Sequence, residues 1–228
     1  MDRGLYIAAS GMLAEQIRQD QIANDLANAS TPGYKADRTS QHTFGALLLA
    51  NSATGAVVGT QSTAVQVGNI ETNFSPNVGR ETGEALDFAI SGEGFFAVQT
   101  AQGIRYTRNG QFALDPQGRL VTAQGDPVLD ASGRAITGTD GVVDPRRLGI
   151  VNLTNPRKEG NSLITGTPAG AAAGSVRAGA LETSGADPAR AMVDMIASMR
   201  AFEAGQKVIQ TIDDTLGKAV TQVGSVVQ

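Results

Sequence analysis

The chain has 228 residues, enough for one good-sized domain or two small ones, and its formal net charge of −4 gives no global basic field of the kind that indicates a nucleic-acid partner. Hydrophobic residues make up 41%, which can support a core, but aromatic residues make up only 4% and glycine is frequent, with 28 copies. Because the sequence contains no cysteine, disulfides, cysteine zinc sites and thiol nucleophiles are excluded.

The opening residues predict a long helix. From residue 3 to residue 29, no proline intervenes, alanine is frequent, and apolar residues recur in steps of about four: Leu5, Ala9, Leu13, Ile17, Ile22 and Leu26. This stretch lacks the unbroken apolar segment of a cleavable secretory signal, so we expect none. No run of about 18 apolar residues occurs anywhere, so we also expect no membrane insertion.

The end of this helix carries an unusual pattern, ANDLANASTPGYK, over residues 23–35. Asparagine is a poor helix former, yet Asn24 and Asn28 are spaced to share one helix face just before the stop. Thr31 precedes a proline, and Pro32 and Gly33 suit the centre of a type II turn. The asparagines are either plain surface residues or amide partners that fix the register of packed helices; we favour the second interpretation.

The C-terminal residues predict a second helix that begins at Asp187-Pro188, a good N-terminal pair. Steps of three and four then produce a mostly apolar stripe with the period of a coiled coil, through Met192, Met195, Met199, Phe202, Gln206, Ile209, Asp213, Leu216 and Val220. Such a stripe must pack against the N-terminal helix, against other copies, or against both.

The middle of the chain predicts an antiparallel β domain or small distorted barrel over residues 66–182. Turn glycines fall seven or eight residues apart, at Gly103, Gly110, Gly118, Gly125, Gly133 and Gly141, and short β-prone runs separate them. Asn109-Gly110 is the strongest hairpin signal. Residues 36–65 read as a linker or extended segment, and a loose loop is expected near 155–178 because both stretches are small and polar.

The predicted fold class is therefore α+β. Residues 1–35 and 183–228 form a discontinuous helical domain, in which the terminal helices pair like a coiled coil and enclose a mostly antiparallel β domain. The expected assembly-interface residues lie on these helices: Leu5, Met12, Asn24, Leu26, Asn28, Met192, Met195, Met199, Phe202, Ile209 and Leu216. Thr31, Pro32 and Gly33 form the expected structural turn.

No pattern in the sequence indicates catalysis. His42 is the only histidine, and a lone histidine is far more often a surface or linker residue than a catalyst. Hence no metal site, cofactor or small-molecule substrate is expected. The SGEGFF stretch (91–96) has neither a G-x-G-x-x-G pattern nor a Walker lysine, so a turn before a strand is the better interpretation, with Phe95 and Phe96 on opposite faces. We expect that the protein is not an enzyme.

Several stretches, in order, resemble the flagellar rod and hook family of bacteria. These are GLYIAASGM (4–12), ANDLANASTPGYK (23–35), LDFAISGEGFFAV (86–98), YTRNGQFALDPQGRLVTAQGDPVL (106–129) and GALETSGADPARAMVDMIASMRAFEAGQKVIQTIDD (179–214). The resemblance covers most of the chain except residues 36–65 and 155–178. One departure is Asp25, where the family usually has asparagine before Leu26.

The resemblance implies a structural subunit of the basal-body rod, the hollow shaft that transmits torque from motor to hook. It also implies self-assembly, assembly with other rod proteins, and export by the flagellar type III apparatus into the cell envelope. The length favours a mid-length rod protein, and the MDRGLYIAASG opening, the STPGY ending and the compact middle favour the more proximal one over the distal one. The alternative of a different class is a secreted adhesin, or a cytosolic scaffold, built from a coiled-coil stalk and a β domain.

Overall fold

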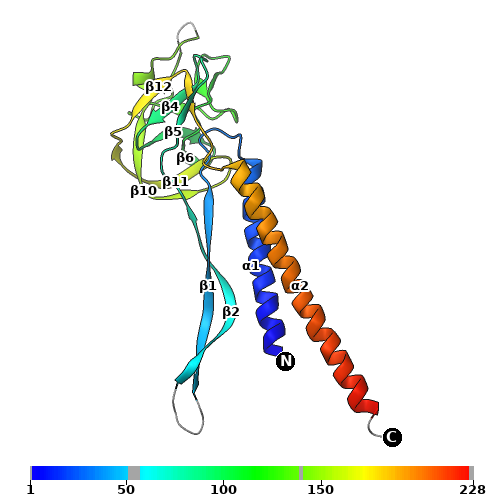
Figure 1. Ribbon diagram of the computed structural model, residues 1–228. Helices are drawn as coiled ribbons and strands as arrows, with labels where there is room; N and C mark the ends of the chain where they lie inside the picture. Colours follow the sequence, from blue (N-terminus) through cyan, green and yellow to red (C-terminus); the bar gives the residue numbers. More distant parts are fainter. Residues whose placement is uncertain (1, 51–56, 139–140, 226–228) are drawn as a thin grey trace. The chain divides into compact units, whose positions relative to one another are not determined.

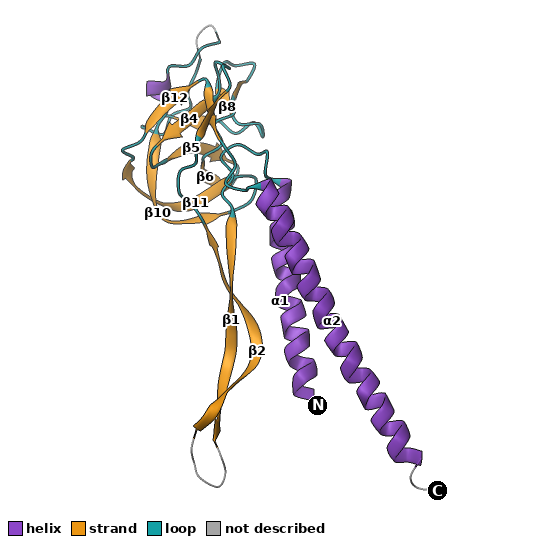
Figure 2. Ribbon diagram, viewed as in Figure 1, coloured by secondary structure: helices purple, strands orange, loops and turns teal. Residues whose placement is uncertain are grey.

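The computed structural model describes residues 2–50, 57–138 and 141–225 (Figure 1). The chain divides into two units. The helical unit comprises Met1–Leu26, Asp37–Glu71 and Pro188–Gln228, and the β unit comprises Ala27–Ala36 and Thr72–Asp187. With a helix toward each end and strands between them, the chain is α+β, as predicted (Figure 2).

The two helices of the helical unit are α1 (Asp2–Ala27) and α2 (Pro188–Ser225). Helix α2 begins with proline at its first position, where the missing amide costs no hydrogen bond. Helix α1 ends at Ala27, earlier than the predicted residue 29, because the chain turns at Asn28. The amide of Thr31 donates to the Asn28 carbonyl at 3.0 Å, which is a turn bond and not a helical one.

Helices α1 and α2 contact each other in antiparallel order. The Ser198 hydroxyl donates to Glu15 Oε2 at 2.6 Å, and Ser198 is fully buried. Farther along, a Cβ added at Gly205 would lie 2.7 Å from Met12 Cγ, and one added at Gly4 would lie 3.5 Å from Ile212 Cδ1. Small residues at this contact therefore let the two backbones approach closely.

The helical unit also contains a two-stranded sheet of β1 (Asp37–Ala50) and β2 (Val57–Thr72). Residues 37–50 and 57–65 of the expected linker or extended segment (36–65) are extended, but they pair as β1 and β2 instead of forming a free linker. The first part of the expected β domain, residues 66–71, belongs to β2 as well. Val and Thr are frequent in β2, and they favour a pleated conformation.

Polar side chains of α1 hold this sheet on the helix. Gln21 donates to the carbonyl of Asp37 and accepts from the Thr39 hydroxyl, both on β1. The Val65 amide of β2 donates to Ser10 Oγ at 3.2 Å. Helix α1 thus bonds to both strands.

Among the described residues, no helix has the length and apolar run needed to cross a membrane.

The described residues of the β unit form short strands and one 3-10 helix. They are β3 (Gly79–Glu81), β4 (Phe88–Ser91), β5 (Phe95–Thr100), β6 (Gly103–Thr107), β7 (Ala113–Leu114), β8 (Leu120–Val121), β9 (Val128–Leu129), η1 (Pro145–Arg147), β10 (Ile150–Lys158), β11 (Leu163–Ala171), β12 (Ser175–Ala178) and β13 (Ala180–Glu182).

The principal sheet of the β unit has the order β10-β11-β6-β5-β9, and β10 also pairs with β5. Strands β10, β11, β6 and β5 therefore form a closed ring of pairings, in which β10 with β5 and β11 with β6 pair at two positions each. Each of these pairings is antiparallel. Small antiparallel pairs, β12 with β4, β13 with β3 and β7 with β8, complete the unit.

Strand β5 separates two apolar clusters. Phe96 and Val98 belong to the larger one, whereas Phe95 and Ala97 belong to the smaller one, as the alternation of a strand requires. The prediction that Phe95 and Phe96 face opposite sides is confirmed. Phe96 packs edge to face on Phe112, with ring centroids 5.3 Å apart.

Two predictions about the β unit were wrong. Asn109-Gly110 forms no hairpin, because β6 pairs with β5 and β11 while β7 pairs with β8. Gly110 instead allows a close backbone approach: an added Cβ would lie 1.6 Å from the Phe88 carbonyl oxygen. The expected loose loop near 155–178 contains part of β10 and all of β11 and β12, since pairing with neighbouring strands orders these small residues.

Candidate functional site

Three charged side chains lie together in the interior of the β unit, and we call them the Glu182 cluster: Lys35, Arg108 and Glu182. Their exposed fractions are 3%, 2% and 1%. Lys35 follows the turn after α1, Arg108 follows β6, and Glu182 ends β13. Charged residues are almost never buried to this extent unless they are paired, so this cluster is the most informative polar feature of the unit.

The turn after α1 places Lys35 in the cluster. The Tyr34 amide donates to the Thr31 carbonyl at 3.3 Å, with Pro32 and Gly33 between them, and Gly33 has φ 66°. The Gly33 amide donates to the Glu182 carbonyl at 2.9 Å. A Cβ at Gly33 would lie 2.3 Å from the carbonyl carbon of Arg108, so only glycine fits this position.

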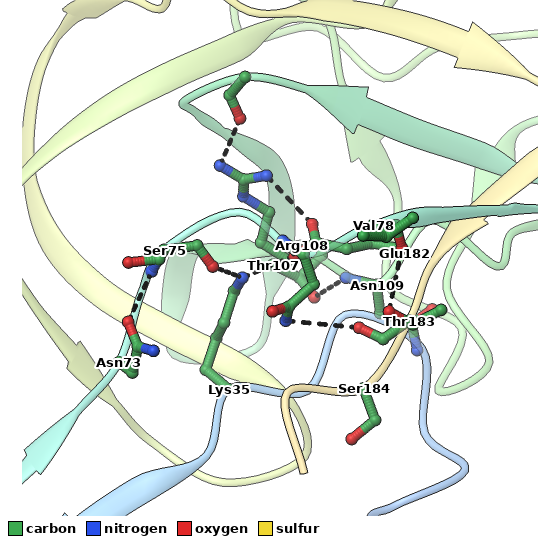
Figure 3. Close-up of polar contacts among 12 residues, drawn as sticks. Lys35, Asn73, Ser75, Val78, Thr107, Arg108, Asn109, Glu182, Thr183 and Ser184 are labelled. Atoms are coloured by element: carbon green, nitrogen blue, oxygen red, sulfur yellow. Dashed lines mark hydrogen bonds and ion pairs between the residues drawn. The ribbon is translucent and has the colours of Figure 1, made fainter. Parts of the chain in front are cut away.

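The carboxylate of Glu182 divides its two oxygens between two sets of donors (Figure 3). Oε1 accepts from Lys35 Nζ at 2.6 Å and from the Asn77 amide at 2.9 Å. Oε2 accepts from Arg108 Nη1 at 3.0 Å. Charge-assisted hydrogen bonds of this kind are the strong ones, and their buried setting removes competition from water.

The two cations have further partners in the β unit. Lys35 Nζ also donates to the Ser75 carbonyl at 2.6 Å. Arg108 Nη2 donates to the Gly92 carbonyl at 2.9 Å, and its guanidinium carbon lies 5.2 Å from the centre of the Phe95 ring. Arg108 therefore joins Glu182 to the turn before β5 and to the smaller apolar cluster.

The cluster holds two cations and one carboxylate, so a net positive charge is buried. Burial lowers the pKa of Lys35 below its ordinary value of 10.5; the carboxylate of Glu182 partly offsets this effect, and Arg108 adds to the lowering. Both oxygens of Glu182 and the ammonium of Lys35 are engaged by protein groups away from solvent. The arrangement suits a structural junction and not proton transfer to a substrate.

Further hydrogen bonds hold together the segments on either side of the cluster. Ser184 Oγ donates to the Asn28 carbonyl at 2.9 Å, and the Gly185 amide donates to the Tyr34 carbonyl at 2.8 Å. Lys158 Nζ donates to the Lys35 carbonyl at 2.9 Å and lies 3.9 Å from the centre of the Tyr34 ring. The chain after α1 and the chain before α2 thus run side by side in the β unit.

The structure separates the sequence-predicted interface residues into two groups. Leu5, Met192 and Met199 have exposed fractions of 41%, 52% and 50%, and Asn24 is also exposed. The remaining residues are half-buried: Met12, Leu26, Asn28, Met195, Phe202, Ile209 and Leu216. The predicted stripe on α2 therefore mixes positions of two faces.

The face of α2 that contacts α1 is shifted from the predicted stripe. Ser198, Gly205 and Ile212 lie at this contact. Each of them precedes by one residue a position of the predicted apolar stripe, namely Met199, Gln206 and Asp213. The difference arises because small residues, which the prediction did not count as packing positions, allow the closest approach of the helices.

Asn28 has a role within the chain. It lies just beyond the end of α1, and its side-chain oxygen accepts from the Thr31 hydroxyl at 3.3 Å. Its carbonyl accepts from the Thr31 amide and from Ser184 Oγ. Asn24, on α1, and Asn28 therefore do not share one helix face as expected.

Sequence reasoning assigned no role to Lys35, Arg108 or Glu182, although all three lie in quoted motif stretches. The available signal was a single charge inside a β-prone run, as in YTRNG and GALETSG. The partners could not be identified, since Lys35 and Glu182 are 147 positions apart. Of the residues that the structure describes, no three His, Asp or Glu side chains gather to hold a metal ion.

Three family descriptions match this chain in order. "Flagella basal body rod protein" matches residues 5–35, "Flagellar hook protein FlgE/F/G D1 domain" matches residues 89–155, and "Flagellar basal body rod FlgEFG protein C-terminal" matches residues 177–222. The chain is similar to the flagellar basal-body rod protein FlgG of Bacillus subtilis, with 34% identity over 96% of this chain and 98% of the relative. The chain belongs to the flagellar basal-body rod family.

Other rod-family relatives match over the full chain. The flagellar hook-basal body complex protein FlhO of Bacillus subtilis is 31% identical over 99% of this chain and 100% of its own length. The flagellar basal-body rod protein FlgF of Caulobacter vibrioides is 32% identical over 99% of this chain and 100% of its own length. The predicted resemblance is thus confirmed, and the adhesin or scaffold alternative is set aside.

As a member of the rod family, the protein is a structural subunit of the flagellar basal body and assembles with other rod proteins. The matches at 5–35 and 177–222 contain two residues of the Glu182 cluster, Lys35 and Glu182, and the match at 89–155 contains Arg108. Each of the three rod-family stretches therefore contributes one charge to the buried junction.

Proposed function

We propose that the subunit polymerises into the rod through its terminal helices, which pair like a coiled coil and stack on those of neighbouring copies. The observation that carries this proposal is a second apolar face on α2. Met192, Ile196 and Met199 follow i, i+4, i+7 spacing, and their exposed fractions are 52%, 54% and 50%. Ser198 and Gly205, which contact α1, lie on a different face.

An apolar face of this size on an isolated subunit marks a protein contact surface. Beyond Met199 the same side of α2 is polar, at Glu203, Gln206 and Gln210, so the apolar face belongs to the N-terminal part of the helix. A separate apolar groove of about 420 Å³ lies on the opposite side of α2, where Ala201, Gly205 and Val208 line it together with α1 and Val65 of β2. A contact between unlike faces that does not close into a ring generates a helical filament.

The test places a charge on the second face. Met199→Asp leaves the α1 contact of Ser198 and Gly205 intact, so the isolated chain should fold. An aspartate buried between subunits is expensive, however, so rods should not form. Thr215→Asp, an exposed position about 160° around the same helix from Met199, is the matched control. Electron micrographs of hook–basal bodies and soft-agar swimming are the measurements, and normal rods in Met199→Asp cells would refute the proposal.

Asn24 is proposed to help fix the register between neighbouring subunits, since it is an exposed amide on α1. Because Asn28 accepts from Thr31 within the chain, the two residues should be changed separately. Asn24→Ala should fold normally but build fewer rods, whereas Asn28→Ala should weaken the end of α1. Normal hook numbers with Asn24→Ala would show that Asn24 is a surface residue with no role in register.

We also propose export in an unfolded state by the flagellar type III apparatus into the envelope. Membership of the basal-body rod family supports this route. Deleting the export apparatus should keep the protein out of the periplasmic fraction while synthesis continues.

The MDRGLYIAASG opening and the STPGY turn support the more proximal of the mid-length rod subunits, and complementation of strains that lack either subunit tests this choice.

A further inference from the structure

We infer that Glu182 mechanically joins the β unit to every chain connection that leads to the helical unit. The chain passes between the two units after residues 26, 36, 71 and 187. Three short segments of the β unit supply these connections: residues 27–36, residues 72–78 and residues 182–187. Each of them is bonded to Glu182 or contains it.

The first two segments bond to the cluster through Oε1 of Glu182 and through its backbone. Segment 27–36 supplies Lys35 Nζ, 2.6 Å from Oε1, and the Gly33 amide, 2.9 Å from the Glu182 carbonyl oxygen. Segment 72–78 supplies the Asn77 amide, 2.9 Å from Oε1, and the Ser75 carbonyl, which accepts from Lys35. One carboxylate oxygen therefore gathers both segments.

The third segment contains Glu182 itself and runs on to the start of α2. Within it, Ser184 and Gly185 bond back to segment 27–36, at the carbonyls of Asn28 and Tyr34. The other oxygen of Glu182, Oε2, is directed to Arg108, which bonds to the Gly92 carbonyl and lies over the Phe95 ring. Oε1 thus bonds to the segments that lead to the helical unit, and Oε2 bonds, through Arg108, to the closed sheet.

This arrangement has a mechanical consequence. A force applied to either terminal helix enters the β unit through segment 27–36 or segment 182–187, so it reaches Glu182 before it reaches the apolar clusters. The ion pairs are buried and short, so water does not compete for them as the force rises. The cluster therefore sets the force at which the helical connections separate from the sheet. This inference depends on contacts within one chain and not on polymerisation.

Single-molecule pulling on the full chain tests the inference. Because the sequence has no cysteine, Ala101→Cys in the turn after β5 and Ala189→Cys in the first turn of α2 provide unique attachment points, and the force then acts directly on segment 182–187. Glu182→Gln keeps the shape of the side chain but removes its charge. We expect its first rupture at a lower force than in the parent chain. An unchanged first rupture force would overturn the inference.

A matched control is Glu81→Gln, on the strand that pairs with β13. Its carboxylate also bonds to an arginine, Arg177, at 3.0 Å, but the side chain is 81% exposed. Exposed pairs contribute little, so this variant should rupture at the parent force. A drop as large as that of Glu182→Gln would show that loss of any carboxylate near this edge weakens the unit, and would overturn the specific role.

Hydrogen exchange gives a second measurement that does not require pulling. In Glu182→Gln, the amides of Gly33, Asn77 and Gly185 should exchange roughly tenfold faster or more, while the Ile136 amide, which donates to the Val128 carbonyl of β9, keeps its rate. A uniform increase at all four amides would overturn the inference. If Glu182→Gln does not fold, Lys35→Met, which keeps the Arg108 pair, must show the same selective increase at Gly33 and Asn77.

Discussion

The close contact of α1 and α2 leads to a quantitative prediction with a control in the same helix. Replacing a glycine inside a helix by alanine raises helix stability by about 1 kcal/mol. Gly217→Ala should give this full gain, because no atom lies within 4 Å of an added Cβ there. At Gly205 the same Cβ would lie 2.7 Å from Cγ and 3.4 Å from Sδ of Met12.

The contact at Gly205 reverses the gain. Inserting a methyl group into a packed contact costs about 1–3 kcal/mol, toward the lower end when a flexible methionine can move. Gly205→Ala should therefore be less stable than Gly217→Ala by about 1–3 kcal/mol, and neutral or destabilised relative to the parent. The free energy of unfolding from urea titrations, followed by far-ultraviolet circular dichroism, measures the difference.

A double variant identifies the contact. Met12→Ala removes the atoms that the new methyl group would meet, so Gly205→Ala should cost less in the Met12→Ala background than in the parent. The same double change with Gly217→Ala should be additive. If Gly205→Ala and Gly217→Ala stabilise the chain equally, the two helices do not pack at Gly205, and the antiparallel pairing described above is refuted.

Further predictions concern backbone strain and buried charge. Ser162→Gly should stabilise the β unit by up to about 1 kcal/mol, because Ser162 has φ 59° and glycine adopts that conformation without strain; a lower melting temperature would contradict this. Gly33→Ala should destabilise by at least about 2 kcal/mol, since alanine adds both strain and a clash with the Arg108 backbone; near-parent stability would contradict it. Burial lowers the pKa of Lys35, so the folded chain loses this proton more easily than the unfolded chain does. The free energy of unfolding should therefore rise, relative to Lys35→Met, as pH increases from the lowered pKa toward 10.5; parallel pH profiles would exclude the effect.

The parts of the fold that depend on local periodicity could be predicted from the sequence. The steps of three and four gave both helices, and the start of α2 was found from Asp187-Pro188. The spaced glycines marked real turns, since Gly103, Gly118 and Gly125 have positive φ. Gly110 does not, because there glycine serves a close approach to Phe88, and composition alone does not distinguish these two uses.

The parts that depend on distant pairing could not be predicted. Strand β11 is rich in Gly, Ala and Thr, and it is a strand because β10 and β6 pair with it. Strand β1 pairs with β2 in the same way. The Glu182 cluster joins residues from three separate stretches, so no short segment of the sequence contains all three charged partners. A lone charge in an apolar strand indicates a buried partner but does not name it.

The hydrogen bond between Ser184 Oγ and the Asn28 carbonyl, 2.9 Å long, brings together two points that are 156 positions apart. The segment between Asn28 and Ser184 therefore begins and ends at nearly the same point of the β unit. Residues 28–184 therefore form one insertion with adjacent ends, and this insertion includes β1 and β2 as well as the β unit. Natural chains could lengthen or shorten loops within residues 73–183 while the helical unit, with β1 and β2, stays unchanged.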